Sequence, residues 1–270
     1  MMGKYVTKFY RLNLNKKEMP AAQLRAVFLT DMHNTAGEEE TDEILGKIRE
    51  VSPDLVLCGG DMLVGKPSRS VLPAVRFLKR LSKEYRVYLG TGNHEYRLKI
   101  YPEQYGDMYA KYRELLSETD VVFLENEKLH LTCRGIPVEL NGFEMKALYY
   151  HRFRHIPLPV SEIREALGKP AGDALTILLS HNPAAMPAYF SWGADLTLCG
   201  HYHGGMVRFG RHHGLISPDF RLFPGNAYGL FRRGKSNVLV SSGCGEHTIP
   251  VRIHNPREIV VIDFYLNEQE

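Results

Sequence analysis

The sequence predicts an α/β (α+β) fold in which two mixed β-sheets pack face to face and carry helices on their outer faces. This prediction rests on short apolar segments that alternate with helix-like segments along the chain. Five of the apolar segments lack strict alternation, which is typical of strands buried on both faces. These five segments span residues 25–30, 54–58, 86–89, 174–179 and 194–199.

The N-terminal part of the chain supplies the outer elements of the first predicted sheet. Residues 4–14 partly alternate between apolar and polar side chains, which predicts an edge strand. Residues 40–51 place four apolar side chains at helical spacing, and Pro53 ends this predicted helix. Residues 71–85 repeat the helical pattern, so strands and helices follow each other as in βαβ units.

Short strands are predicted between two further helices. The helices are expected at residues 103–117 and 161–167. Within residues 121–150 we expect short antiparallel strands that turn at Arg134-Gly135 and at Asn141-Gly142. The rest of the chain reads as a long Gly- and Arg-rich loop and two closing strands, at residues 206–234, 237–241 and 259–264.

The composition is that of one globular unit. The 270 residues are 44% hydrophobic and 24% charged, and the formal net charge is +3. Neither repeats nor low-complexity tracts divide the chain, so we predict a single domain over residues 1–270. The mild charge and the absence of an extended basic stripe argue against nucleic acid as a partner.

The cysteines and the hydropathy pattern indicate a cytoplasmic protein. The four cysteines show no CxxC spacing, and Cys58 and Cys199 end apolar segments as small buried residues do. This usage favours a reducing compartment. Because no apolar run approaches the roughly 18 residues of a membrane span, any membrane contact is expected to be peripheral, on the inner face, unless an anchor lies outside this sequence.

Polar residues with metal-binding side chains follow each of the five predicted strands. In open α/β sheets, such residues meet beyond the carboxyl ends of the strands. In Asp31-x-His33 and His201-x-His203 the two residues are on the same side of an extended chain. Carboxylate, amide and imidazole groups in this number can hold two adjacent divalent metals, a common device for phosphate-ester hydrolysis. The seven candidate ligands are Asp31, His33, Asp61, Asn93, His181, His201 and His203.

These motifs carry a resemblance to a known superfamily. Asp31-x-His33, Gly60-Asp61, Gly92-Asn93-His94-Glu95, His181 and Gly200-His201-x-His203 match the calcineurin-like metallophosphoesterases in order and spacing. The resemblance implies a four-layer α/β/β/α sandwich.

Segments 198–208, 241–245 and 250–259 narrow the resemblance to the bacterial YaeI/YkuE-like phosphodiesterase subgroup, which is similar to enzymes that cleave UDP-diacylglucosamine and related pyrophosphates. Two features depart from it: the hydrophobic N-terminal anchor is absent, and Glu95 replaces the more usual Asp.

The resemblance also implies roles for the candidate residues. One metal would be held by Asp31, His33, Asp61 and His203, and the other by Asp61, Asn93, His181 and His201. The bridging Asp61 and the neighbouring His94 would be catalytic, with a metal-bridging hydroxide as nucleophile and His94 as a protonated imidazole that assists the leaving group. This ligand mixture suits Mn, our first expectation, or Fe, Zn or Co, with Mg as a further alternative.

The expected substrate is a phosphodiester or pyrophosphate, such as a nucleotide-linked lipid or an envelope intermediate. Arg97 and Arg208 are candidate contacts for phosphate oxygens. Aromatic and basic residues in 149–154 and 206–234 suit an acyl chain, a base or an anionic membrane surface, unless the aromatic side chains are tucked into the core. The alternatives are a phosphomonoesterase for phosphoproteins or nucleotides and, less favoured because all seven ligands are present, a non-catalytic scaffold.

Overall fold

The computed structural model describes residues 4–16, 19–246 and 251–267. Pro250, the first residue of the segment 250–259 that resembles the YaeI/YkuE-like subgroup, lies outside the described residues. Two six-stranded mixed sheets form the centre of the molecule. The first sheet has the order β1 (Tyr5–Leu14), β14 (Arg257–Leu266), β2 (Ala22–Leu29), β3 (Leu55–Cys58), β4 (Val87–Gly90) and β5 (Val121–Leu124). The second has the order β12 (Gly229–Arg233), β13 (Ser236–Val240), β9 (Leu196–Cys199), β8 (Leu175–Leu179), β7 (Ile136–Gly142) and β6 (Glu127–Cys133).

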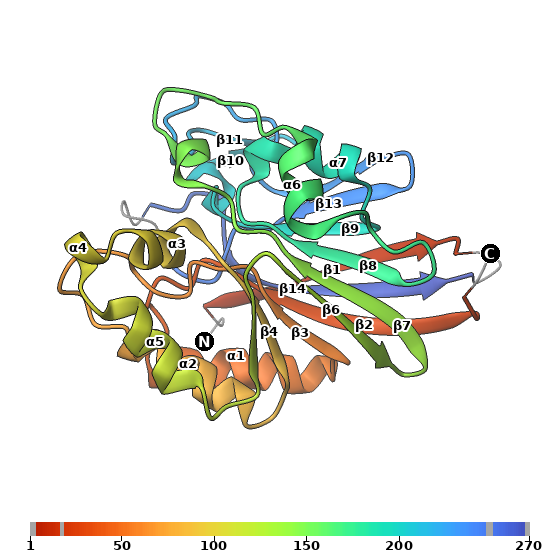
Figure 1. Cartoon of the computed structure of the whole chain (residues 1–270), viewed down its shortest axis with the longest axis horizontal. Helices are drawn as coiled ribbons and strands as arrows, with labels where there is room; N and C mark the ends of the chain where they lie inside the picture. The colour runs from red at the N-terminus through yellow and green to blue at the C-terminus, as the bar shows by residue number, and fades with distance from the viewer. Residues whose placement is uncertain (1–3, 17–18, 247–250, 268–270) are drawn as a thin grey trace.

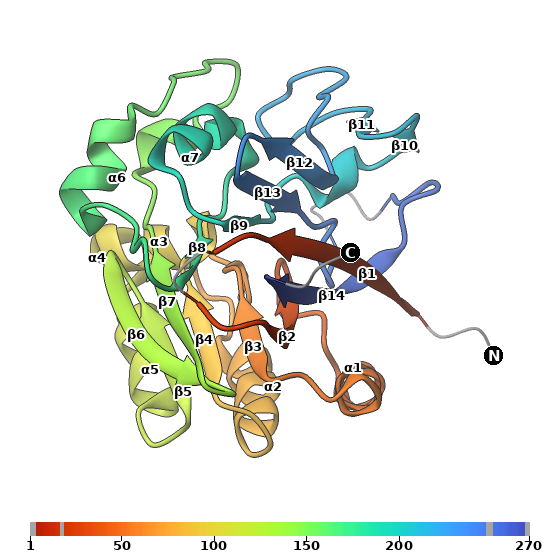
Figure 2. The same ribbon diagram turned by 90° about the vertical axis from the view of Figure 1, so that its right-hand side faces the viewer.

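Helices cover the outer face of each sheet, as Figures 1 and 2 show. The first sheet is covered by α1 (Glu38–Val51), α2 (Leu72–Ser82) and α5 (Met108–Leu116), and the second by α6 (Val160–Leu167) and α7 (Met186–Trp192). Between the sheets lies an apolar core that includes Phe28, Leu57, Leu140, Ile177 and Leu198, all fully buried. The predicted four-layer α/β/β/α arrangement is therefore confirmed.

All five apolar segments form strands, and residues 4–14 form the edge strand β1, which pairs in parallel with β14. The predicted helix at 103–117 is instead two helices, α4 (Pro102–Tyr105) and α5. Gly106 separates them because its φ of 60° lies in the left-handed region, which glycine adopts without a steric penalty. A further helix, α3 (Asn93–Ile100), begins at the ligand motif that follows β4.

The two predicted turns between short strands have different outcomes. Arg134 and Gly135 have positive φ and connect β6 to β7 in a tight hairpin, as predicted. The turn predicted at Asn141-Gly142 is wrong, because β7 continues through Gly142. This glycine pairs with Glu127 on one side and Leu179 on the other, and a Cβ there would collide with Leu124.

The segment predicted as a long loop contains three short strands: β10 (Arg208–Phe209), β11 (His213–Gly214) and β12. Among the described residues, none of the helices is long and apolar enough to cross a membrane. The site described next lies beyond the carboxyl ends of the strands. It is formed by the loops after β2, β3 and β4 of the first sheet and after β8 and β9 of the second sheet.

Candidate metal centre

The predicted ligands lie in turns with unusual backbone conformations. Each turn directly follows a buried strand, so the strand fixes the point from which the side chain projects. A left-handed backbone conformation costs a non-glycine residue about 1–3 kcal/mol of free energy, and such residues cluster at functional sites. Five of the seven predicted ligands have such positive φ angles: Asp31 (54°), His33 (48°), Asp61 (53°), His201 (66°) and His203 (45°).

Asp61 lies at the centre of one group of side chains. Its Oδ2 is 3.1 Å from His181 Nε2, 3.8 Å from His33 Nε2 and 3.9 Å from His94 Nε2. Its other oxygen, Oδ1, accepts a hydrogen bond from the backbone N–H of His94 at 2.8 Å. One carboxylate oxygen therefore faces imidazole nitrogens from three different loops.

Asp31 organises the second group. Its Oδ1 lies 3.3 Å from His203 Nε2 and 3.6 Å from His181 Nε2. The Nε2 atoms of His33 and His203 approach each other to 3.1 Å. Ligand atoms of Asp31, His33 and His203 lie within 4.8 Å of one another, as do those of Asp61, His181 and His201. The structure thus brings together the residues that the sequence assigned to two neighbouring metals.

The electrostatics of the site indicate a need for positive charge. Burial raises the pKa of Asp31 to about 6. Burial acts in the same direction on Asp61, but the imidazoles around it, His181 first, hold the pKa of Asp61 well below its usual value. Burial lowers the pKa of His181, yet Asp61 and Asp31 outweigh this effect and raise it to about 10. The buried carboxylates of Asp31 and Asp61 therefore converge on His181 Nε2 and favour a positive charge at that position.

The hydrogen bonds of His181 test whether a metal fits. Its Nδ1 lies 2.8 Å from the carbonyl of Gly59, so in the neutral ring Nδ1–H donates there and the lone pair of Nε2 points at Asp61 and Asp31. Nε2 is buried and makes no hydrogen bond of acceptable geometry to the described residues. A lone pair facing two carboxylates is repulsive unless a proton or a metal ion lies between them. Metal-binding histidines typically donate their other ring N–H to a backbone carbonyl, as His181 does to Gly59.

Asn93 gives a second test of fit. With its amide nitrogen toward the cluster, it donates to Asp61 Oδ2 (3.3 Å) and His201 Nδ1 (2.9 Å), while its oxygen accepts from Arg97 (2.7 Å). In the opposite orientation the amide oxygen faces two acceptors, Asp61 Oδ2 and His201 Nδ1. A cation between these atoms would remove their repulsion. The donor set of carboxylate, amide and imidazole groups therefore fits divalent metals of the Mn, Fe, Co and Zn type.

Comparisons with known proteins agree with this geometry. A family model described as calcineurin-like phosphoesterase matches residues 24–205. The chain belongs to the calcineurin-like phosphoesterase family. This membership confirms the superfamily that the sequence motifs indicate, and it implies a dinuclear divalent metal site.

The relatives within this family are distant in sequence. The chain is 28% identical over 247 residues to an uncharacterized metallophosphoesterase of Helicobacter pylori; this match covers 89% of the chain but only 59% of that relative. It is 24% identical over 235 residues to the uncharacterized metallophosphoesterase YkuE of Bacillus subtilis, covering 83% of the chain and 72% of YkuE. TT1561 of Thermus thermophilus has the same fold, with a TM-score of 0.51 at 12% identity over 82% of this chain and 90% of that one.

Glu95, which departs from the usual family motif, holds the backbone of the loop that carries Asp61. Its buried carboxylate accepts hydrogen bonds from the backbone N–H groups of Asp61 (2.8 Å), Met62 (2.8 Å) and Gly92 (3.2 Å). Burial and the charge of Asp61 raise the pKa of Glu95 to about 7. The longer side chain therefore reaches the backbone of the neighbouring loop and leaves the ligand cluster intact.

The two arginines predicted to contact substrate lie in different environments. Arg97 is partly buried beside the cluster, and its Nε donates to the carbonyl of Asn93 at 3.1 Å. Arg208 is 11% exposed, pairs with the buried Glu258 at 3.2 Å and stacks over the ring of Tyr228. The structure thus places Arg97 at the site and engages Arg208 in a structural ion pair.

Three residues outside the set of predicted site residues also support the site. Thr30 donates its hydroxyl to Asp31 Oδ2 at 3.0 Å, and Asn255 donates to the carbonyl of His203 at 2.6 Å. The ring of Tyr150 lies 5.1 Å from that of His201, measured between centroids. Tyr150 had a sequence signal as part of an aromatic, basic segment, whereas nothing in the sequence connects Asn255 to a histidine 52 residues away.

Proposed function

We propose that this chain is a dinuclear-metal-dependent hydrolase of phosphodiesters or pyrophosphates, with a nucleotide-linked lipid or envelope intermediate as its substrate class. The observation that carries the proposal is the convergence of buried imidazole nitrogens on Asp61 and Asp31. Family membership supports the hydrolysis of phosphoesters. The choice of a diester is supported by the aromatic and basic side chains beside Tyr150, which suit a large, partly apolar leaving group.

The ligand positions assign a role to each of the seven residues. When bound, two divalent metal ions polarise phosphoryl oxygens and lower the pKa of water toward neutrality. Asp61 is shared because its oxygen faces histidines of both groups. Manganese is the metal we propose, for the mixed oxygen and nitrogen ligands. One ion would be held by Asp31, His33, Asp61 and His203, and the other by Asp61, Asn93, His181 and His201.

His94 is oriented to donate a hydrogen bond to the substrate. The backbone N–H of Gly65 donates to His94 Nδ1 at 2.7 Å, so the hydrogen of the neutral ring is on Nε2. Nε2 faces the cluster, 3.9 Å from Asp61 Oδ2. Protonating Nδ1 would break the bond to Gly65, so we propose that His94 acts as a neutral Nε2–H donor to phosphate or leaving-group oxygens, in place of the protonated imidazole that the sequence suggested.

Arg97 completes the proposed site. Its contact with Asn93 places its guanidinium group at the edge of the ligand cluster, where it would contact a phosphate oxygen. Arg208 is already paired with Glu258, so we assign it no substrate contact.

The proposal is tested by comparing bis-p-nitrophenyl phosphate with p-nitrophenyl phosphate. Protein stripped of metal and refilled with Mn²⁺ should cleave the diester faster, and Asp61→Asn should abolish this activity. Dominant cleavage of the monoester would favour the phosphomonoesterase alternative. Failure to cleave either ester with any divalent metal would contradict hydrolysis of simple phosphate esters.

The role of His94 is tested with two leaving groups. His94→Ala should lower turnover of a phenyl phosphodiester by about 10²–10³-fold, the usual loss when one hydrogen-bond donor to developing negative charge is removed. The loss should be smaller for the p-nitrophenyl diester, because less negative charge localises on its leaving oxygen. Equal losses for both esters would show that His94 does not contact the leaving-group oxygen.

A further inference from the structure

Six large apolar side chains gather on two loops near the site. They belong to residues 151–158 and 206–224, and we name them the aromatic patch: Phe153, Phe209, Leu215, Phe220, Leu222 and Phe223. The most exposed are Phe153 (81%), Leu222 (63%) and Phe223 (57%). The sequence left open whether the aromatic side chains of this region are tucked into the core, and at these positions they are exposed. Exposed apolar groups of this kind mark interaction surfaces.

Hydrogen bonds and ring contacts hold the two loops together. The backbone N–H of Phe153 donates to the carbonyl of Asp219 at 3.1 Å, and the rings of Phe153 and Phe220 stack with centroids 4.9 Å apart. Phe209 and Phe223 make an edge-to-face contact at 5.8 Å. The patch is therefore built by the fold from segments more than 50 residues apart, and its rings pack against one another across the two loops.

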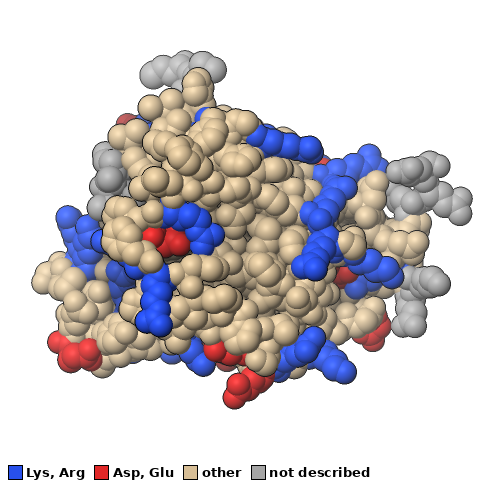
Figure 3. Space-filling model, turned by 90° about the horizontal axis from the view of Figure 1, so that it is seen from above, with Lys and Arg blue, Asp and Glu red and all other residues tan. Residues whose placement is uncertain are grey.

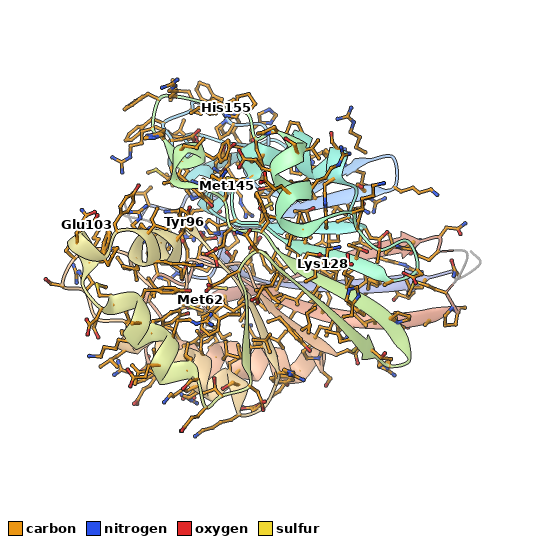
Figure 4. All side chains as sticks on the ribbon, viewed as in Figure 1. Met62, Tyr96, Glu103, Lys128, Met145 and His155 are labelled. Carbon is orange, nitrogen blue, oxygen red and sulfur yellow. The ribbon has the colours of Figure 1, made fainter. Side chains whose placement is uncertain are left out.

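The charges around the patch are mostly positive. Arg152, Arg154 and Arg211 are exposed, and Arg152 lies over the ring of Phe220 at 5.3 Å. In the sequence of the two loops the only acidic residue is Asp219, which already accepts a hydrogen bond from the Ser217 hydroxyl. Seen from above, this side of the molecule is largely uncharged, with more Lys and Arg than Asp and Glu around the uncharged area (Figure 3). His155 marks the outer end of the first loop, at the top of the molecule in Figure 4.

We propose that the aromatic patch docks this protein on an anionic lipid bilayer. Phenylalanine and leucine side chains at loop tips enter the interfacial region, and the arginines lie at the level of acidic headgroups. The positive charges beside the patch favour an anionic bilayer over an apolar protein surface as the partner, because only the bilayer offers acidic headgroups to the arginines. Tyr150 directly precedes the first loop, so a bilayer on the patch would lie at the edge of the metal centre.

The test is co-sedimentation of the full chain with vesicles. Phosphatidylcholine vesicles that contain about one-third phosphatidylglycerol should bind at least about tenfold more tightly than phosphatidylcholine alone. This preference should weaken at high salt, because counterions screen charges at the membrane surface. Phe153→Ser with Leu222→Ser should abolish binding, and Arg152→Glu with Arg154→Glu should remove the preference for the anionic lipid.

Matched controls separate the patch from general effects. Leu72→Ser changes a leucine of 40% exposure on α2, and Lys83→Glu with Lys111→Glu reverses two exposed charges away from the patch. These controls should bind vesicles like the wild type. Vesicle binding is measured independently of bis-p-nitrophenyl phosphate turnover, so failure of the proposed activity leaves this test intact.

Two results would overturn the proposal. The first is equal binding to neutral and anionic vesicles, or binding to neither. The second is a dimer in light scattering that the Phe153→Ser, Leu222→Ser variant converts to a monomer, since the patch would then be covered by a second copy of the chain.

Discussion

Replacing Gly200 by alanine should displace Asp31 from the metal centre. A Cβ at this position would lie 2.9 Å from Thr30 Cγ2 and closer still to Asp31 Oδ2 and Thr30 Oγ1. The φ angle of Gly200 is not in the left-handed region, so alanine fits the backbone and only the space is lacking. To reach an ordinary carbon–oxygen contact of about 3.3 Å, the Asp31 carboxylate must move by roughly 1 Å.

The magnitude follows from what this movement disturbs. Overpacking a well-filled interior costs about 1–3 kcal/mol. The moved carboxylate also weakens its bonds from the His201 N–H and the Thr30 hydroxyl, both at 3.0 Å; each bond to a charged group is worth about 1.5–3 kcal/mol. We therefore expect the free energy of unfolding to fall by about 2–5 kcal/mol and the Mn²⁺ dissociation constant to rise by at least about tenfold.

The assays are urea unfolding in the presence of EDTA and calorimetric titration with Mn²⁺. Gly46→Ala is the matched control, because a Cβ there meets nothing within 4 Å and the residue lies inside α1. This control should be stabilised by about 0.5–1 kcal/mol and bind Mn²⁺ normally. Gly200→Ala with wild-type stability and wild-type Mn²⁺ affinity would refute the assignment of Asp31 to a tightly packed ligand position.

Three further predictions follow from the contacts around the site. Glu95→Gln leaves backbone N–H groups of the Asp61 loop without a full set of acceptors; it should lower the free energy of unfolding by about 1–3 kcal/mol, and an unchanged urea midpoint would contradict this. Arg208→Ala isolates the buried Glu258 and should cost about 3–5 kcal/mol with little effect on KM; a raised KM at unchanged stability would return Arg208 to substrate binding. Mn²⁺ at 100 times its dissociation constant should raise stability by about 2.7 kcal/mol for each site that it fills in thermal unfolding, and Asp61→Asn should lose most of this gain.

The fold was largely predictable because its signals are local. Buried strands are recognisable as short apolar runs, and the positions of α1 and α2 follow from helical spacing and, for α1, from Pro53. The predictions failed where a glycine was judged without its neighbours. Gly106 breaks a helix, whereas Gly142 still pairs as the last residue of β7, because β6 and β8 supply pairing partners on both of its sides.

The sequence by itself determined which side chains gather beyond the strand ends, because the end of each strand and the type of each ligand are both encoded locally. Only the tertiary structure decided how these groups act. The Gly65 N–H sets the proton position on His94, the Gly59 carbonyl directs His181, and Glu258 withdraws Arg208 from the site. The aromatic patch likewise exists only because Phe153 meets Phe220 across the fold. These outcomes depend on contacts between residues far apart in the chain, which local patterns do not specify.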